Sequence, residues 1–492
     1  MSTATEPRAR PDAGLRAWAR GQWRRLAALT VASAALAAFF GRTFGTVTDD
    51  GRLYLQLAHN LLRTGHYTRL FEGHWIASTA RLPGYPLLLA AVYRFAPWGR
   101  LAPLFALQWL LLAATAAAAA WLARLVAPRE AEPAATGRAM LAAFGLVALC
   151  PFLSMYTAVV LSEVPATLCT TVAIGCGLAA LRAREGDATA PPSHRELAWW
   201  AGSGGALAAG ILLRPDTGVV LLVLSVPLWR GLGARRRRGW RPLALLVAIA
   251  LAPLAAWTVR NWVELGVFRP LVTAEATEVG EPQHPGFDRW ALTWLAGYRG
   301  VEDVLDNVPG AAIDPAMLPS RALGRGPARA QTLALIAAYN RDDDLTPGLD
   351  AAFGRLAAAR IRRHPLRFFL LLPLARMTSL WFSPRIEFLP LDDHWWPPGA
   401  AWENDARDFS VTAGFLLLNA AYLALALWGL WAARPRYRAL LVGLAVARTA
   451  ALGAYISCEP RYVLELYPLV LVWAAWGAVA RFGRRARPAG GG

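Results

Sequence analysis

Long apolar stretches separated by short arginine-rich segments recur along the chain. A helix that crosses the hydrocarbon core of a bilayer needs about 20 mostly apolar residues, and the pattern predicts about ten such helices. Their predicted ranges are 25–46, 101–126, 139–159, 163–182, 197–213, 216–230, 242–261, 409–431, 439–457 and 463–480. The pattern therefore predicts an all-α polytopic membrane protein.

Three further segments have helical apolar spacing but are too short or too polar to cross. Leucines recur at helical intervals from Leu53 to Leu62, which predicts a helix lying flat on the membrane. We expect 84–97 and 366–382 to lie as helices in the outer interface. If they were counted as spans, the arginine clusters would no longer all fall on one side of the membrane. For 366–382, which follows several arginines, a true span is the alternative.

The composition supports the membrane assignment. The residues AVILMFWYC make up 56% of the chain before its 42 glycines are added, whereas soluble domains are about 45–50% apolar with glycine included. All 51 basic residues are arginine, and the net charge is +18. The absence of lysine excludes Schiff-base chemistry and a P-loop lysine. The four cysteines form no CxxC pair, so we expect neither a disulfide framework nor a zinc site.

The arginines give the orientation. With ten spans, every cluster falls on the same side as both termini, which is the cytoplasmic side by the positive-inside rule. The clusters are Arg20, Arg24 and Arg25; Arg124, Arg129 and Arg138; Arg182 and Arg184; Arg230 with Arg235 to Arg238; Arg434, Arg436 and Arg438; and Arg481, Arg484, Arg485 and Arg487. Basic residues spread between apolar runs are typical of a membrane protein, so we expect no nucleic-acid partner.

On the opposite side, charged residues follow the first span. Asp49 and Asp50 come directly after it, and adjacent carboxylates there can divide the work of a general base and an orienting group. An ordinary acidic pair at a helix end is the alternative. Arg81 lies in ARLPGYP, where it could bind an anionic headgroup or simply extend to the interface.

More charged residues stand at the outer ends of later spans. Glu163 lies between two apolar runs, where it needs a partner or begins a helix capped by Ser162. Three arginines occur at such ends, where the positive-inside rule does not explain them, and together they could neutralise a phosphate. They are Arg214 in LLRPDTG, Arg260 in WTVRNW and Arg461 in SCEPRYVLELYP. The alternative is internal pairing of Arg214 with Asp216 and of Glu459 with Arg461.

The order of these motifs resembles a known superfamily. The run DDGRLYLQLAHNLLRTGHYT, followed by RLPGYPLLLA, SEVP, LRPD, RNW with PLVT, and PRY, resembles GT-C glycosyltransferases. It is similar to bacterial members of glycosyltransferase family 39, relatives of protein O-mannosyltransferases and of the lipid A aminoarabinose transferase. The resemblance covers nearly the whole membrane part. It implies a GT-C-type transmembrane bundle with periplasmic interfacial helices in a bacterial inner membrane.

The resemblance also implies an activity. Such enzymes transfer a sugar from a polyprenyl-phosphate donor to an acceptor hydroxyl of a lipid, glycan or protein on the extracytoplasmic face, with inversion. Carried over to this chain, Asp49 is the expected base, Asp50 organises the site, and Glu163 is the acidic residue of the second external loop. The residues that we expect to bind substrate are Arg81, Tyr85, Arg214, Arg260, Arg461 and Tyr462; the arginine roles are inferred from charge.

The chain is expected to divide as its topology does. The expected parts are a basic arm (1–24), a transmembrane module (25–261) with a catalytic first loop (47–100), an extracytoplasmic region (262–408), C-terminal helices (409–480) and a basic tail (481–492). His59, His66 and His74 match no metal-ligand pattern, so we expect no histidine metal site, although a divalent cofactor stays open. A flippase of lipid-linked sugars, or a transferase of a non-hexose group, is the alternative. A flippase should show inverted repeats and broken helices, and the sequence shows neither.

Overall fold

The computed structural model describes residues 11–71, 73–185, 191–234, 240–273, 276–391 and 395–482. This part is almost entirely helical, with one two-stranded hairpin. By length and composition, six of its helices can cross a membrane, or seven if one bent pair is a single span. A multi-pass helical membrane protein is confirmed, whereas the predicted number of ten spans is not. Arg235 to Arg238, Arg484, Arg485 and Arg487 lie outside the described residues.

Each predicted span nevertheless corresponds to a helix. The six candidate spans are α2 (Trp23–Thr43), α5 (Leu101–Leu125), α8 (Glu163–Ala183), α11 (Trp240–Leu265), α19 (Ala406–Ala432) and the segment of η5 (Pro460–Leu466) and α21 (Tyr467–Phe482). The others are α6 (Pro133–Ala148) with α7 (Pro151–Met155) and η1 (Tyr156–Ala158), α9 (His194–Leu213), η2 (Pro215–Thr217) with α10 (Gly218–Ala234), and α20 (Arg438–Ala454).

Glycines allow close contact within this bundle: a Cβ added at Gly429 of α19 would lie 2.0 Å from the carbonyl oxygen of Trp473 in α21.

The third predicted span is broken. Helix α6 and the α7–η1 segment are bent by 44° relative to each other. Pro151 begins α7, and proline lacks the amide hydrogen and the space that a continuous helix needs. The expectation that the chain has no broken helix is therefore wrong for this segment.

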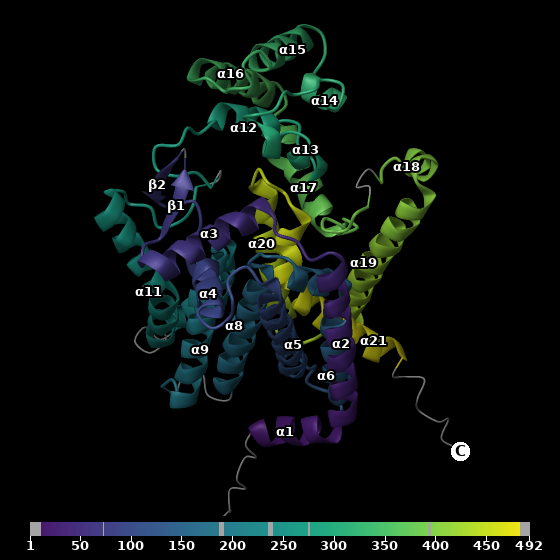
Figure 1. Cartoon of the computed structure of the whole chain (residues 1–492). Helices are drawn as coiled ribbons and strands as arrows, with labels where there is room; N and C mark the ends of the chain where they lie inside the picture. The colour runs from purple at the N-terminus through teal and green to yellow at the C-terminus, as the bar shows by residue number, and fades with distance from the viewer. Residues whose placement is uncertain are drawn as a thin grey trace, which may run out of the picture.

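The first external loop forms ordered structure over the end of the bundle. Figure 1 shows α3 lying across its upper end, followed by the hairpin and by α4. The bounds are α3 (Asp49–Thr64), β1 (Thr68–Phe71), β2 (His74–Ala77) and α4 (Gly84–Tyr93). The helix predicted from the leucine spacing is thus confirmed. With ten residues, α4 is about half as long as the hydrocarbon core is thick.

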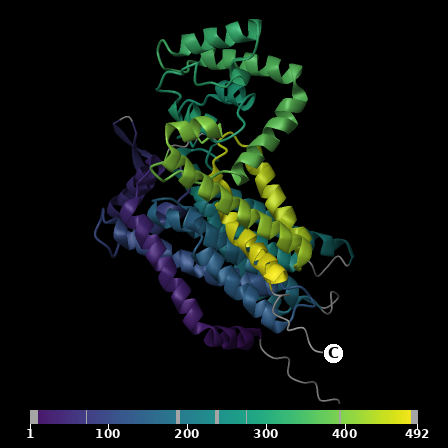
Figure 2. The same ribbon diagram turned by 90° about the vertical axis from the view of Figure 1, so that its right-hand side faces the viewer.

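A helical lobe stands beyond this end of the bundle in both views (Figures 1 and 2). It comprises α12 (Pro285–Leu292), α13 (Arg299–Glu302), η3 (Leu305–Asn307), α14 (Ser320–Leu323), α15 (Pro327–Tyr339) and α16 (Pro347–Arg363). Its core is aromatic, with Phe287 and Phe353 in edge contact at 5.2 Å between ring centroids. A π-helix, η4 (Arg367–Leu371), and α17 (Leu372–Trp381) lead back to the bundle, and α18 (Pro398–Asn404) precedes α19.

The opposite end carries the arginine clusters. The amide of Arg436, between α19 and α20, donates to the carbonyl of Val126 after α5 at 2.8 Å. The Arg436 guanidinium pairs with Glu185 after α8. Trp18 of α1 (Pro11–Gly21) donates to Gly137 near the start of α6 at 3.3 Å. These contacts bring four of the predicted cytoplasmic segments together at the end away from the lobe.

Candidate active site

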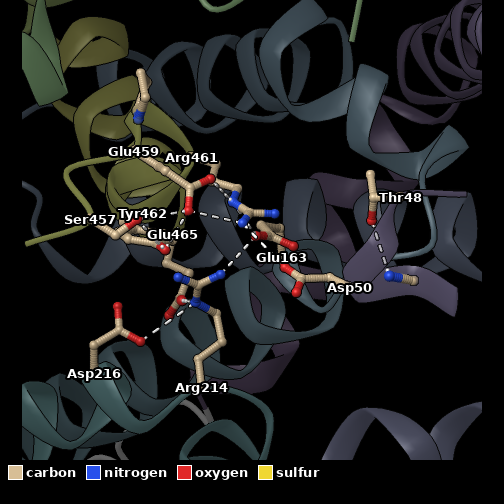
Figure 3. A network of polar contacts seen from close by, with 12 residues as sticks. Thr48, Asp50, Glu163, Arg214, Asp216, Ser457, Glu459, Arg461, Tyr462 and Glu465 are labelled. Carbon is tan, nitrogen blue, oxygen red and sulfur yellow. Dashed lines mark hydrogen bonds and ion pairs between the residues drawn. The ribbon is translucent and has the colours of Figure 1, made fainter. Parts of the chain in front are cut away.

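Ionised side chains from separate elements meet at the end of the bundle that faces the lobe. Figure 3 shows that the network includes Asp50, Glu163, Arg214 and Arg461, which the sequence singled out. They lie in the first turn of α3, the first turn of α8, the turn after α9, and η5. All four follow or precede apolar helices, so the packing of those helices brings the charges together.

Asp50 lies between two arginines. Its Oδ1 pairs with Arg81 and its Oδ2 lies 3.3 Å from Arg461 Nη2. Burial by itself raises the pKa of Asp50, but the two guanidinium groups outweigh burial and hold that pKa below its usual value. Asp50 is therefore a carboxylate at neutral pH, and its pairing raises the pKa of Arg81 although burial opposes the rise.

Asp49 does not join this network. Its side chain is 93% exposed and pairs with Arg52 one turn later, at 2.5 Å. Thr48 is the N-cap of α3, and its side chain accepts from the amide of Gly51 at 3.0 Å. Asp49 thus sits in the first helical turn, where a negative charge is favourable, and its carboxylate points away from the arginines.

Glu163 is a buried carboxylate of the site. Its side chain is 3% exposed, and Oε1 lies 2.7 Å from Arg214 Nη1 and 3.8 Å from Arg461 Nε. Its other oxygen, Oε2, is buried and has no hydrogen-bond partner in the part of the chain that the structure describes. Glu163, Tyr156 and Thr167 help to line a cavity of about 10 Å³, which is close to the minimum for one water molecule. Ser162, expected as a possible cap, makes no capping bond.

The segment that contains PRY adds a further acidic residue, Glu459. Arg461 Nε lies 2.5 Å from Glu459 Oε2, and the Tyr462 hydroxyl donates to Glu459 Oε1 at 2.5 Å. The Arg214 guanidinium lies 4.8 Å from the centre of the Tyr462 ring. Arg214 also lies 3.5 Å from Asp216. Both internal pairs weighed from the sequence therefore exist, but they belong to one continuous network and are not separate pairs.

Two residues of the network were missed from the sequence. Arg448 of α20 is fully buried and lies 2.5 Å from Asp216 and 2.8 Å from Glu465. Glu465 also accepts from Thr170 at 2.8 Å and lies 3.0 Å from Arg214. A charged residue inside an apolar helix is costly unless it is paired. Arg448 and Glu465 lie within predicted spans, so their positions in the sequence already indicated that each has a buried partner.

The network contains more acids than bases. Its arginines are Arg81, Arg214, Arg448 and Arg461, and its carboxylates are Asp50, Glu163, Asp216, Glu459 and Glu465. Four positive against five negative charges leave one negative charge when all are ionised. Each of these arginines is already paired, so an anionic ligand would compete with a carboxylate for the same guanidinium.

Two expected substrate-binding residues lie apart from the network. Arg260 donates to the carbonyls of Ser78 at 2.9 Å and Tyr67 at 3.0 Å, which supports the loop that carries Arg81. Tyr85 is fully buried and its hydroxyl donates to Gln108 at 3.1 Å. In this structure Arg260 therefore holds the loop of Arg81 in position, and Tyr85 is part of the packed core.

A buried clamp fixes the Arg81 loop from its other side. Glu278 accepts from the Ser78 hydroxyl and from the Thr79 amide, both at 2.6 Å. Arg69 lies 2.9 Å from the same carboxylate. Because Ser78 and Thr79 come just before Arg81, the clamp sets where the Arg81 guanidinium can reach.

Two further acids near the site were not singled out from the sequence. Burial raises the pKa of Glu387, which follows α17, and neither of its carboxylate oxygens has a hydrogen-bond partner among the described residues. Arg385 ties this segment to the site by donating to the carbonyl of Pro460 at 2.7 Å. Asp306 of the lobe has its pKa raised to about 6 by burial and by Glu459.

The residues that the structure describes include no group of three or more His, Cys, Asp or Glu side chains placed to hold a metal ion. His59, which lies nearest in sequence to Asp50 among the histidines, packs against Trp98 at 4.5 Å between ring centroids.

No protein-family model and no curated protein matches the chain. Solved structures similar to it include the oligosaccharyltransferase AglB from Archaeoglobus fulgidus in complex with an inhibitory peptide and a dolichol-phosphate (13% identity, 96% of this chain and 53% of that chain, TM-score 0.47). Another is ArnT from Cupriavidus metallidurans bound to undecaprenyl phosphate (16% identity, 92% and 77%, TM-score 0.40). These are GT-C superfamily glycosyltransferases. The chain spans about half the length of the AglB chain, and at these identities and TM-scores the similarity assigns it no activity.

Proposed function

We propose that the chain is a membrane glycosyltransferase of the inner membrane. It would move a sugar from a polyprenyl-phosphate-linked donor to a hydroxyl of a lipid, glycan or protein acceptor on the periplasmic or outer face, with inversion. The observation that carries this proposal is Asp50 between Arg81 and Arg461. This carboxylate–arginine group lies at the end of the bundle opposite the arginine clusters, and its residues belong to the motifs that resemble GT-C enzymes.

The arginines suit the donor end of the reaction. A guanidinium binds phosphate oxygens in a planar, bidentate manner, and charge develops on the phosphate as the sugar leaves. In the proposed step the acceptor oxygen bonds to the anomeric carbon while the bond from that carbon to the phosphate oxygen breaks. The electron pair stays on the polyprenyl phosphate, where Arg81 and Arg461 stabilise it.

The carboxylate suits the acceptor end. A hydroxyl is a weak nucleophile, so a base must take its proton as the new bond forms. We assign this proton to Asp50, and not to Asp49 as the resemblance implies, because Asp50 is the member of the pair that faces the arginines.

Donor binding would also strengthen the base. Arg81 and Arg461 hold the pKa of Asp50 low while they pair with it. When the donor phosphate takes these guanidinium groups, the pKa of Asp50 rises and its affinity for the acceptor proton increases. The base would thus be strongest when the donor is in place.

The test compares sugar transfer by purified wild-type protein, Asp50→Asn and Asp49→Asn. The donors are synthetic undecaprenyl-phospho-sugars and the acceptor is an envelope extract. We expect a loss of at least about a hundredfold in Asp50→Asn, the scale of general-base catalysis, and a change of less than about threefold in Asp49→Asn. The reverse ranking would move the base to Asp49. Specific binding of the lipids without transfer by any variant would contradict a transferase and favour the flippase.

A further inference from the structure

Five arginines gather where the lobe meets η4. Arg360, Arg362 and Arg363 end α16, Arg367 begins η4, and Arg321 belongs to α14. We call this set the basic patch. None of the five forms an ion pair in the part of the chain that the structure describes.

Hydrogen bonds to neutral oxygens hold two members of the patch in position. Arg360 donates to the Thr332 hydroxyl at 2.8 Å and to the Leu323 carbonyl at 3.2 Å. Arg321 donates to the Trp294 carbonyl at 2.8 Å. Burial and the like charge of Arg367 lower the pKa of Arg360 to about 10. The patch is therefore an uncompensated positive surface on which an anion relieves repulsion.

An apolar surface adjoins the patch. Leu366 is 74% exposed and Phe369 is 69% exposed, and Leu370, Leu371 and Leu374 are exposed as well. These five residues, which we call the apolar ledge, belong to η4 and its flanks. The same segment buries Leu372, Arg376 and Leu380, so only one of its faces packs on the protein.

The position of the apolar ledge along the length of the bundle follows from the contacts of α17 with α20. Arg376 donates to the carbonyl of Gly453 at 2.8 Å, near the outer end of α20. Trp381 donates to Thr449 at 3.0 Å, one turn further in. Because α17 runs inward along α20, the residues before Arg376 lie toward the lobe. The ledge is thus at the outer end of the bundle, and Arg360 to Arg363 come before it at the base of the lobe.

We propose that the basic patch and the apolar ledge form a docking site for anionic phospholipids of the outer leaflet, which seats the lobe on the membrane. The ledge would insert among acyl chains near the headgroups, and the arginines would bind the phosphates above it. Paired apolar and basic surfaces of this kind are how interfacial helices bind anionic bilayers. The charge of the patch selects lipid headgroups over a neutral protein partner.

The test uses the full chain in nanodiscs of phosphatidylcholine with and without phosphatidylglycerol. Hydrogen–deuterium exchange is measured on the amides of residues 360–372. We expect phosphatidylglycerol to slow exchange there by about tenfold or more, and high salt to reverse the effect because it screens headgroup charge. The triple variant Arg362→Glu, Arg363→Glu, Arg367→Glu should lose the protection.

A matched variant carries the same change of charge elsewhere on the lobe, at the exposed residues Arg289, Arg329 and Arg341. It should keep the protection. If charge reversal prevents folding, the same positions are changed to Gln, with an unchanged melting temperature as the check. Protection that is absent in wild type, or that survives removal of the patch charges, overturns the proposal.

Discussion

Asp306 brings a charge from the lobe to the candidate active site. It lies in η3, with part of the residue open to solvent. Partial burial of its carboxyl group and the nearby carboxylates of Glu459 and Asp50 raise its pKa to about 6, against the opposing effect of Arg461. Asp306 is therefore neutral below about pH 6 and negative above it, so it adds repulsion toward an anionic donor at neutral pH.

Asp306→Asn should remove a pH dependence of donor binding. Affinity of wild type for an undecaprenyl-phospho-sugar, a phosphodiester without its own titration in this range, should fall about threefold to tenfold as pH rises from about 5 to about 7.5. The variant should bind at all pH values as wild type does at low pH. Affinity is measured by titration in detergent, with Asp314→Asn, an exposed residue of the lobe, as the control. An unchanged pH profile in Asp306→Asn would contradict this role.

The division between Asp49 and Asp50 comes from helix geometry. Successive residues of a helix point about 100° apart, so only one of two adjacent carboxylates can face the arginines. Thr48 begins α3 as its cap, and this start fixes which of the two points inward. In the structure it is Asp50 that contacts Arg81 and Arg461.

Helices α19 and α21 owe their contact to glycine. A Cβ at Gly429 would lie 2.0 Å from the Trp473 carbonyl oxygen and 2.8 Å from the Gly477 amide. A Cβ at Gly477 would lie 2.2 Å from the Leu425 carbonyl oxygen. Small residues at both positions let the two backbones approach, as is common between helices in membranes. Because α21 continues from η5, this contact also sets the position of Arg461.

Gly429→Ala should force the two helices apart. We expect a loss of about 1–3 kcal/mol in the free energy of unfolding, the range for overpacking, seen as a lower melting temperature in detergent. Gly414→Ala is the matched control on the same helix, since nothing lies within 4 Å of its added Cβ. It should be neutral or stabilise by about 0.5–1 kcal/mol. Equal melting temperatures for the two variants would show that the helices can separate without cost.

The bundle has two chemically different ends. Arg436 connects the segments after α5 and α8 at one end, and the ion network and the lobe lie at the other. From the positive-inside rule we propose that the first end faces the cytoplasm. The network would then open to the periplasmic side, where a polyprenyl-linked donor presents its sugar.

Cysteine labelling in intact cells can test this orientation. A membrane-impermeant maleimide should label Ser320→Cys, on the exposed surface of the lobe, and should label Ser193→Cys, before α9, only after the cells are permeabilised. The unsubstituted protein serves as the control, since Cys150, Cys176 and Cys458 are buried and Cys169 is half-buried. Labelling of Ser193→Cys in intact cells would reverse the topology and contradict a periplasmic site.

The helices and most of the charged residues of the network could be predicted from the sequence alone. Spanning length, apolar composition and arginine bias are local properties, so each can be predicted without knowing the neighbours. Asp50, Arg81, Glu163, Arg214 and Arg461 were found in this way. Arg448 was open to the same argument, because an unpaired charge in an apolar helix is costly.

The partners of those charges were decided by the tertiary structure. Asp50 and Arg461 stand at opposite ends of the chain, yet lie 3.3 Å apart, and Arg260 is directed to backbone carbonyls and not to the network. The break at Pro151 and the approach of α17 to α20 likewise depend on packing. Contacts between distant segments follow from how each helix is rotated and placed, and local sequence patterns do not encode these quantities.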